Sequence, residues 1–247
     1  MRVNLIDFTG KGSADETWYA ADLLIFTKST RLTMSPGLMD EIRAWPVEKK
    51  QAELEYMANT IPSSWEFASY TFMIEGVSRA FTHQFVRSRQ GSYAQQTMRV
   101  LNMGEYDYVY TDRVKADVQA RGIVDIVNEN IRLGYNKLIE LGFPAEDARG
   151  ILPTNISTNI VAKFNLRAFV DLAKSRAGGR TQGEYQKVMN AMVDEVLKVH
   201  PWADKFLFQQ GRDYFAEIEA FAEREYGGDL LKKGALLKIV DKMRKGA

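Results

Sequence analysis

The sequence predicts an α+β protein in which a central, mostly antiparallel sheet is flanked by helices. Segments rich in β-branched and aromatic residues indicate strands near residues 2–9, 65–77 and 156–164. Stretches of helical periodicity lie between them, but strands and helices do not alternate one for one, as they would in a doubly wound parallel sheet. The 247 residues, 45% hydrophobic and 26% charged, can bury a sizeable core in one domain or in two small ones.

The elements before residue 79 follow from local patterns. Apolar residues lie among polar ones at 2–9, which is typical of a strand, and a glycine-punctuated turn follows at 10–13. This turn lacks the G-x-x-x-x-G-K-[ST] spacing of a phosphate-binding loop. The elements expected next are helices at 15–28, 35–45 and 47–60 and a strand at 65–77.

Residues 79–99 carry the strongest functional signal. Val77, Phe81 and Phe85 recur every four residues, which predicts a helix with one apolar stripe. A second stripe carries the cations Arg79 and Arg87 with a histidine between them, and like charges four apart destabilise a helix by about 0.2–0.5 kcal/mol per pair. Such a row indicates acidic partners in the fold or an anionic ligand, unless it is simply a solvated face.

A polar run follows this helix. The helical pattern breaks at residues 90–92, and the next residues are rich in amide and hydroxyl groups up to Arg99. Arginine binds phosphate through two parallel hydrogen bonds, while Gln, Ser and Thr can bond to bases and sugars. The mixture favours a nucleotide ligand.

The second half of the chain is predominantly helical in its pattern. The expected elements are a short strand at 106–110, helices at 115–141 (ended by Gly142) and 144–152, a strand at 156–164, helices at 166–176 and 182–200, and a helical region after Pro201. The tail at 232–247 is basic, so it could contact phosphate or a membrane surface. Such a tail is more often a packed or frayed terminal helix.

The composition excludes several classes of chemistry. The chain has no cysteine and only two histidines, which excludes thiolate nucleophiles and disulfides and argues against a metal site. The formal net charge of +1 gives no general reason to expect nucleic acid or a membrane as partner. No apolar run approaches the roughly 20 residues of a membrane span. Charged residues also interrupt the first 16 positions, against a secretory signal, so we expect a cytoplasmic protein.

Residues 87–100, read as R-S-R-Q-G-S-Y-A-Q-Q-T-M-R-V, resemble the signature R-H-R-x-x-S-x-N-E-x-S-x-R-Y of flavin-dependent thymidylate synthases. The approach at 65–79 also resembles that family. Further downstream, A-R-G-I-L-P at 148–153 is similar to its A-R-x-x-L-P element. N-L-R at 165–167, Arg176 and Q-G-E at 182–184 are similar to its later motif. The sequence is therefore identified as a divergent member, with one domain of that fold over residues 1–247.

The resemblance implies reductive methylation of deoxyuridylate (dUMP) to thymidylate, with FAD as cofactor and methylenetetrahydrofolate and NADPH as co-substrates. It also implies a homotetramer whose active sites combine residues of different subunits. The expected catalytic residues are Arg176 and Thr97, with Thr97 binding substrate rather than attacking it. The residues expected to bind dUMP are Gln84, Arg87, Gln95, Arg99 and Arg149. The residues expected on the flavin side are Ser88, Arg89, Ser92, Asn165, Arg167 and Asp171.

Several positions depart from the family pattern, mostly on the cofactor side. They are Phe67, Ser88 and Arg180 in place of histidine, Asp171 in place of asparagine, Ala94-Gln95 in place of N-E and Val100 in place of tyrosine. A glutamine at 95 has an amide donor as well as an acceptor oxygen, which could redirect the enzyme to deoxycytidylate. A hydroxymethyl product, a nucleotide-binding homologue without activity and a nucleic-acid-binding module remain as alternatives.

Three of the proposed site residues also have plain structural interpretations. Arg149 and Arg176 could form surface ion pairs with Glu146 or Asp171, which contribute little to stability. Asn165 could cap the helix that follows the strand at 156–164. A capping role and a binding role can coexist in one residue.

Overall fold

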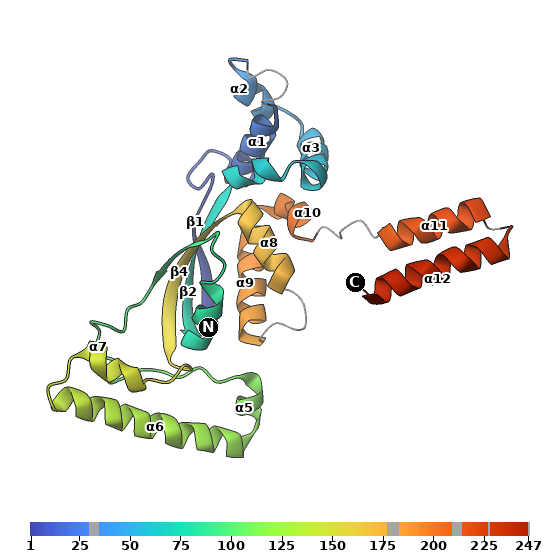
Figure 1. The fold of residues 1–247 in the computed structure, drawn as a ribbon. Helices are drawn as coiled ribbons and strands as arrows, with labels where there is room; N and C mark the ends of the chain where they lie inside the picture. Colours follow the sequence, from blue (N-terminus) through green and yellow to red (C-terminus); the bar gives the residue numbers. More distant parts are fainter. Residues whose placement is uncertain (30–34, 177–182, 209–213, 227, 247) are drawn as a thin grey trace. The chain divides into compact units, whose positions relative to one another are not determined.

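The computed structural model describes residues 1–29, 35–176, 183–208, 214–226 and 228–246. The chain forms two compact units, Met1–Leu207 and Phe208–Ala247, which are described separately (Figure 1). The proposal of a single domain over residues 1–247 is not tested by this division. No helix in the described part of the chain is long and apolar enough to cross a membrane.

The first unit is built on a four-stranded sheet with the order β1-β2-β4-β3. All neighbouring strands are antiparallel, which confirms the predicted α+β class. The strands are β1 (Arg2–Phe8), β2 (Ser69–Ser78), β3 (Ser92–Gln95) and β4 (Ser157–Asn165). The short strand β3 lies in the polar run after the signature helix, where the sequence pattern did not indicate a strand.

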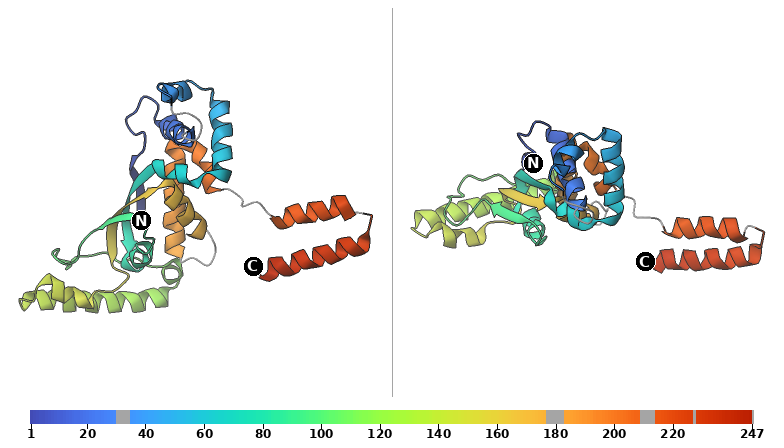
Figure 2. Two further views of the ribbon diagram at one scale, coloured as in Figure 1. Left: turned by 45° about the horizontal axis from the view of Figure 1, so that its top comes forward. Right: turned by 90° about the horizontal axis from the view of Figure 1, so that it is seen from above.

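Helices cover the sheet and its ends, as Figures 1 and 2 show. Helices α8 (Leu166–Arg176) and α9 (Gly183–Val199) pack on the sheet, α8 against β4 and α9 against β1 and β2. The N-terminal helices are α1 (Glu16–Lys28), α2 (Leu38–Arg43), α3 (Val47–Thr60) and the 3-10 helix η2 (Pro62–Phe67). The predicted strand at 65–77 therefore begins later, because Pro62 starts a 3-10 turn.

One hydrophobic core joins these layers. It contains buried aromatic side chains of the sheet and of the helices that cover it, including Tyr70, Phe72, Phe164, Phe169 and Tyr185. The rings of Phe72 and Phe169 stack with their centroids 5.4 Å apart, which fixes α8 on the sheet. The unit ends with η4 (Pro201–Ala203) and α10 (Asp204–Leu207).

A smaller helical layer lies between β3 and β4 in the sequence. It consists of α5 (Asp112–Ala116), α6 (Val118–Glu140), α7 (Ala145–Ala148) and η3 (Arg149–Ile151). The predicted helix at 115–141 is divided at Asp117, whose side chain accepts a hydrogen bond from the Ala120 amide and caps α6. The predicted strand at 106–110 is reduced to a single bridge between Tyr108 and Ile156.

The second unit is a hairpin of two helices, α11 (Tyr214–Tyr226) and α12 (Leu230–Gly246), which lie antiparallel (Figure 1). Ala222 and Val240 are buried, and an ion pair joins Glu223 to Lys233 across the hairpin. The basic tail is therefore a terminal helix that packs against its neighbour.

Candidate functional site

Helix α4 (Arg79–Phe85) follows β2 directly, and Ser78 fixes its start. The Ser78 hydroxyl accepts a hydrogen bond from the Phe81 amide at 3.0 Å, which is a helix N-cap. The carboxylate of Glu184 accepts two further bonds, one from the Ser78 amide at 2.8 Å and one from its hydroxyl at 2.5 Å. The beginning of α9 thus holds the beginning of α4.

The inner face of α4 is aromatic, as its apolar stripe predicted. Phe81 and Phe85 are fully buried and stack with their centroids 5.0 Å apart. Tyr185 of α9 packs edge-on against both rings, and Tyr93 of β3 packs against Phe85. This packing fixes α4 between α9 and β3, so that the polar side of α4 is held next to the end of β3.

Three arginines gather where β3 ends. Arg79 donates to the backbone carbonyl of Gln96 at 2.9 Å. Arg99 forms an ion pair with Glu146 through its Nε at 2.9 Å, and Arg149 donates to the backbone carbonyl of Glu146 at 3.2 Å. The surface ion pair considered for Arg149 is therefore made by Arg99 instead.

Arg79 and Arg149 lie close enough to repel each other. Burial and the neighbouring charge of Arg149 both lower the pKa of Arg79, and in the described structure the Nε of Arg79 is buried without a hydrogen-bond partner. Two guanidinium groups in mutual repulsion, with Glu146 as the nearby carboxylate, form a cationic site that an anion would stabilise. Arg79 was part of the predicted row of cations but was not assigned a role.

Gln95 and Thr97 lie beside this cluster. Gln95 donates to the hydroxyl of Thr82 on α4 at 2.8 Å, and the Thr97 hydroxyl accepts from the amide of Arg99 at 3.1 Å. Both predicted substrate-side residues thus lie on the segment that continues from β3 to Arg99. Gln84 is half-buried on α4.

The turn between α4 and β3 carries the first group of predicted flavin-side residues. Tyr93 donates its hydroxyl to the Ser88 carbonyl at 2.7 Å, and the Gly91 amide also donates to that carbonyl. Gly91 is required here, because a Cβ would lie 2.4 Å from a ring carbon of Phe164. Ser92 begins β3 opposite Lys163 of β4, which places this turn at the end of β4 that leads into α8.

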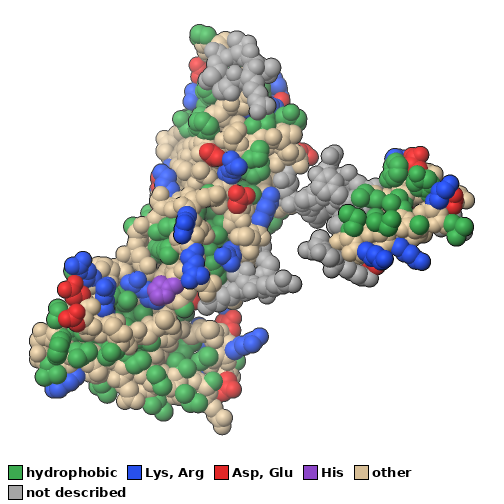
Figure 3. Space-filling view, in the orientation of Figure 1, with side chains coloured by type: hydrophobic (Ala, Val, Ile, Leu, Met, Phe, Trp, Pro, Cys, Tyr) green, Lys and Arg blue, Asp and Glu red, His purple; other side chains and the backbone are tan. Residues whose placement is uncertain are grey.

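Arg87 and Arg89 in this turn are exposed and have no side-chain partner in the described part of the chain. Figure 3 shows Lys and Arg side chains gathered around an exposed histidine on this unit. His83 is exposed, whereas His200 is fully buried. In the row of cations, His83 and Arg87 are exposed, whereas Arg79 is partly buried.

The second group of predicted flavin-side residues lies at the start of α8. The side-chain oxygen of Asn165 accepts from the Ala168 amide at 2.8 Å, so Asn165 is a helix N-cap, as the structural interpretation suggested. Arg167 forms an ion pair with Glu66 at 2.8 Å, and Asp171 is exposed on the next turn. The amide nitrogen of Asn165 is left for a further contact.

The predicted residues therefore form two groups at opposite ends of β3. Gln95, Thr97, Arg99 and Arg149 lie at one end, and Ser88, Arg89, Ser92 and Asn165 lie at the other, together with Arg87, which was predicted to bind the nucleotide. Arg176 belongs to neither group, because its guanidinium stacks 4.9 Å from the ring centroid of Tyr185. Arg180 and Gln182 lie outside the described residues.

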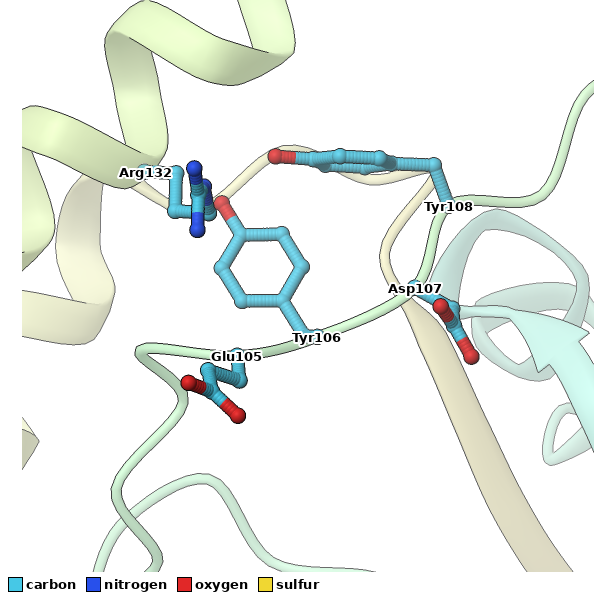
Figure 4. Close-up of a pocket in the computed structure, with 5 residues that line it drawn as sticks. All are labelled: Glu105, Tyr106, Asp107, Tyr108 and Arg132. Carbon is cyan, nitrogen blue, oxygen red and sulfur yellow. The ribbon is translucent and has the colours of Figure 1, made fainter.

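A separate open cleft of about 390 Å³ lies against α6 and contains none of the predicted residues. Figure 4 shows its lining residues, with the hydroxyl of Tyr106 directed toward Arg132. Burial raises the pKa of Tyr106, and Arg132 is paired with Glu129 at 2.6 Å. The arginine of this cleft is thus paired with a carboxylate, as Arg99 is, whereas Arg79 and Arg149 have no carboxylate partner among the described residues.

Comparison with known proteins assigns the family. A family model described as "Thymidylate synthase complementing protein" matches residues 4–202. A flavin-dependent thymidylate synthase of Pyrococcus furiosus is 32% identical over 203 residues, which cover 80% of both chains. One from Clostridium tetani is 33% identical over 195 residues, which cover 72% of this chain and 78% of the relative.

A flavin-dependent thymidylate synthase of Sulfurisphaera tokodaii is 36% identical over 136 residues, covering 55% of this chain and 53% of that protein. The chain thus spans about half the length of this relative and four-fifths of the one from P. furiosus. The match to the family model includes strands β2, β3 and β4, most of β1, helix α4 and both groups of predicted residues. The chain therefore belongs to the flavin-dependent thymidylate synthase family.

Proposed function

We propose that this protein catalyses the flavin-dependent reductive methylation of dUMP to thymidylate. The observation that carries the proposal is the cluster of Arg79, Arg99 and Arg149 at the end of β3, in which only Arg99 is paired with a carboxylate in the described structure. The excess of positive charge in this cluster matches a phosphate group. Family membership supplies the reaction class.

In this proposal the nucleotide phosphate lies among the three arginines. Their guanidinium groups are donors in a planar geometry that suits phosphate oxygens, and the phosphate relieves the repulsion between Arg79 and Arg149. Arg99 exchanges its ion pair with Glu146 for the phosphate, at little cost because exposed ion pairs contribute about 0–1 kcal/mol. The base then extends along β3 past Gln95.

The turn at the other end of β3 fits a flavin nucleotide. Arg89 presents a guanidinium group without a partner in the described structure, and Ser92 presents an exposed hydroxyl. These groups suit the diphosphate of FAD, and the free amide nitrogen of Asn165 supplies one more donor. The replacement of the signature histidine by Ser88 leaves the backbone of the turn ordered, because Tyr93 and Gly91 both bond to the Ser88 carbonyl.

Bound reduced flavin supplies the hydride in this reaction, with methylenetetrahydrofolate as carbon donor and NADPH as reductant. The chain itself contributes orientation and electrostatics. An arginine beside the pyrimidine carbonyl stabilises negative charge on the ring, and Arg176 is the residue we assign to this role. Its Nε is buried without a partner in the described structure, which leaves the group available for a ligand.

We also propose that the active site is completed between subunits of a homotetramer. Arg87 and Arg176 are not in contact with Arg149 in the described chain, although all three are assigned to the same nucleotide. A second copy of the chain can supply Arg87 and Arg176 to the cluster of the first. This arrangement would explain why two sets of nucleotide-binding residues lie apart in one chain.

The first experiment is the visible spectrum of the purified protein with added FAD, with and without dUMP, followed by an assay for thymidylate. We expect a bound-flavin spectrum that dUMP perturbs, and thymidylate as the product by mass. A deoxycytidylate substrate or a hydroxymethyl product would appear directly in the product mass. Nucleotide binding without flavin binding would refute the enzyme proposal and favour an inactive homologue.

A pair of variants tests the position of the phosphate. Arg149→Gln removes a charged donor, so the Kd for dUMP should rise about 10- to 100-fold, since hydrogen bonds to charged groups contribute about 1.5–3 kcal/mol. Arg121→Gln is the matched control, because Arg121 is exposed on α6 and pairs only weakly with Asp125 at 3.8 Å. Equal affinity of both variants for dUMP would exclude the arginine cluster as the phosphate site.

A further inference from the structure

The side chain of Gln95 is hydrogen-bonded to the hydroxyl of Thr82, which can donate only one hydrogen bond. Thr82 on α4 is fully buried, and its hydroxyl donates to the backbone carbonyl of Arg79 at 3.1 Å. The same hydroxyl lies 2.8 Å from the Gln95 side-chain nitrogen. Because its proton is already used, the hydroxyl can only accept from Gln95.

This arrangement fixes the orientation of the Gln95 carboxamide. A flipped carboxamide would bring its oxygen to the Thr82 oxygen, and both atoms would then be acceptors unless Thr82 gave up its bond to Arg79. The NH₂ group of Gln95 therefore faces Thr82, and its Oε1 is left as an acceptor. The bond to Thr82 uses one of the two N–H donors of this NH₂ group and fixes the side on which Oε1 lies.

The neighbouring arginine cluster has no acceptor atoms for a ligand, so Oε1 of Gln95 complements it. The guanidinium groups of Arg79, Arg99 and Arg149 can only donate hydrogen bonds, so they cannot satisfy an N–H or O–H group of a ligand. We infer that Thr82 is a positioning residue, which locks Gln95 so that its Oε1 accepts a hydrogen bond from an N–H or O–H group of the nucleotide. This inference rests on the proposed nucleotide site.

The inference also bears on the change from glutamate to glutamine at position 95. One of the two N–H donors of the glutamine amide is used inside the protein by Thr82, and the orientation that this bond fixes leaves Oε1 as the acceptor that a carboxylate would also provide. At the position of Oε1 a donor group on the nucleotide is accepted, and an acceptor group finds no partner there. In dUMP the candidate donors are the N3–H of the base and the 3′-hydroxyl of the sugar.

The test measures nucleotide binding by calorimetry in the full chain. In Thr82→Val the new side chain has nearly the shape of threonine but cannot accept a hydrogen bond from Gln95. The Gln95 carboxamide is then free to flip. We expect the Kd for dUMP to rise about five- to tenfold, the usual effect of losing one neutral hydrogen bond. Thr82→Ser retains the hydroxyl and should stay within about twofold of the original protein.

Two analogues identify the donor and exclude a merely structural role. One is N3-methyldeoxyuridylate, which lacks the N3–H, and the other is 2′,3′-dideoxyuridylate, which lacks the 3′-hydroxyl. The analogue that lacks the relevant donor cannot bond to Gln95 in either protein. Thr82→Val and the original protein should therefore bind that analogue equally well. Equal weakening of dUMP and both analogues, or an unchanged Kd for dUMP, would overturn the inference.

The experiment separates this inference from the proposed function. Binding of dUMP by the original protein, with Thr82→Val unaffected, overturns the role of Thr82 and leaves the proposed function intact. An original protein that binds no dUMP overturns the proposed function and the inference with it. Unfolding curves of the two Thr82 variants confirm that each is folded under the assay conditions.

Discussion

Protonation of His200 should destabilise this protein strongly below neutral pH. His200 is fully buried, with Nε2 3.1 Å from the Glu16 carbonyl and Nδ1 3.0 Å from the Tyr70 hydroxyl. The carbonyl can only accept, so Nε2 carries the proton and Nδ1 accepts from Tyr70. A second proton on Nδ1 would break the bond to Tyr70 and place an unpaired charge in the core.

Burial lowers the pKa of His200 from 6.5 to about 4 in the folded state. Between these two values the unfolded chain binds a proton that the folded chain does not, so stability falls as the pH falls from about 6.5 to about 4. Each tenfold difference in proton affinity is 1.36 kcal/mol, which gives a total loss of about 3 kcal/mol. Above pH 6.5 this contribution is fully present.

The assay is urea unfolding at several pH values between about 7.5 and 4.5. The variant His200→Gln cannot titrate, so its stability should depend much less on pH in this window than that of the original protein. His83→Gln is the matched control, because His83 is the other histidine and is exposed. A His200 ring resonance that titrates near pH 6.5, identified in the NMR spectrum of His83→Gln, would refute the reasoning.

Three further predictions concern the fold around the site. Ser78→Ala removes the N-cap of α4 and should lower the free energy of unfolding by about 1 kcal/mol; an unchanged denaturation midpoint would contradict this. Gly91→Ala puts a Cβ 2.4 Å from an aromatic ring and should cost about 1–3 kcal/mol in thermal unfolding, whereas Gly150→Ala, where a Cβ meets nothing within 4 Å, should not. Lys50→Met leaves Asp22, its partner at 2.7 Å, as an unpaired buried charge. The free energy of unfolding should fall by about 3–5 kcal/mol at neutral pH, and by less at a pH where the Asp22 carboxyl is protonated. A loss of stability that does not depend on pH would argue against the ion pair.

The helices were the most predictable part of the fold. Residues 166–176 and 47–60 were expected to be helical and form α8 and α3 with the same bounds. The first of these follows a helix-capping Asn165, and both repeat their apolar residues at helical spacing, so the signal lies within the segment itself. The bounds of a helix could be predicted from the sequence where the local pattern and the tertiary packing favour the same structure.

Strand β3 could not be predicted, because Tyr93 alone in its sequence favours a strand. Its sequence S-Y-A-Q has no β-branched residue, and it becomes a strand through pairing with β4, which lies about 65 residues later in the chain. The opposite error occurred at 106–110, where the aromatic residues suggested a strand but form only the bridge from Tyr108 to Ile156. In both cases a distant partner decided the outcome.

The same limit applies to the site. Motifs proposed Arg99 and Arg149 as separate residues, but their common contact with Glu146 depends on the packing of α7 beside the end of β3. The closeness of Arg79 to Arg149, 70 positions apart, and the bond between Thr82 and Gln95 are likewise tertiary contacts. The catalytic and binding roles of these residues stay predictions.

The geometry of β3 explains how one nucleotide could connect the two groups of residues. From Ser92 to Gln95 the strand advances three residues, or about 10 Å at the usual rise of about 3.3 Å per residue. In the proposed function, a nucleotide with its phosphate at Arg149 would extend its base along this length, toward the turn where we place the flavin. In this proposal the strand sets the distance between the phosphate site and the flavin turn, and Gln95, at the phosphate end of the strand, offers its acceptor oxygen to the nucleotide.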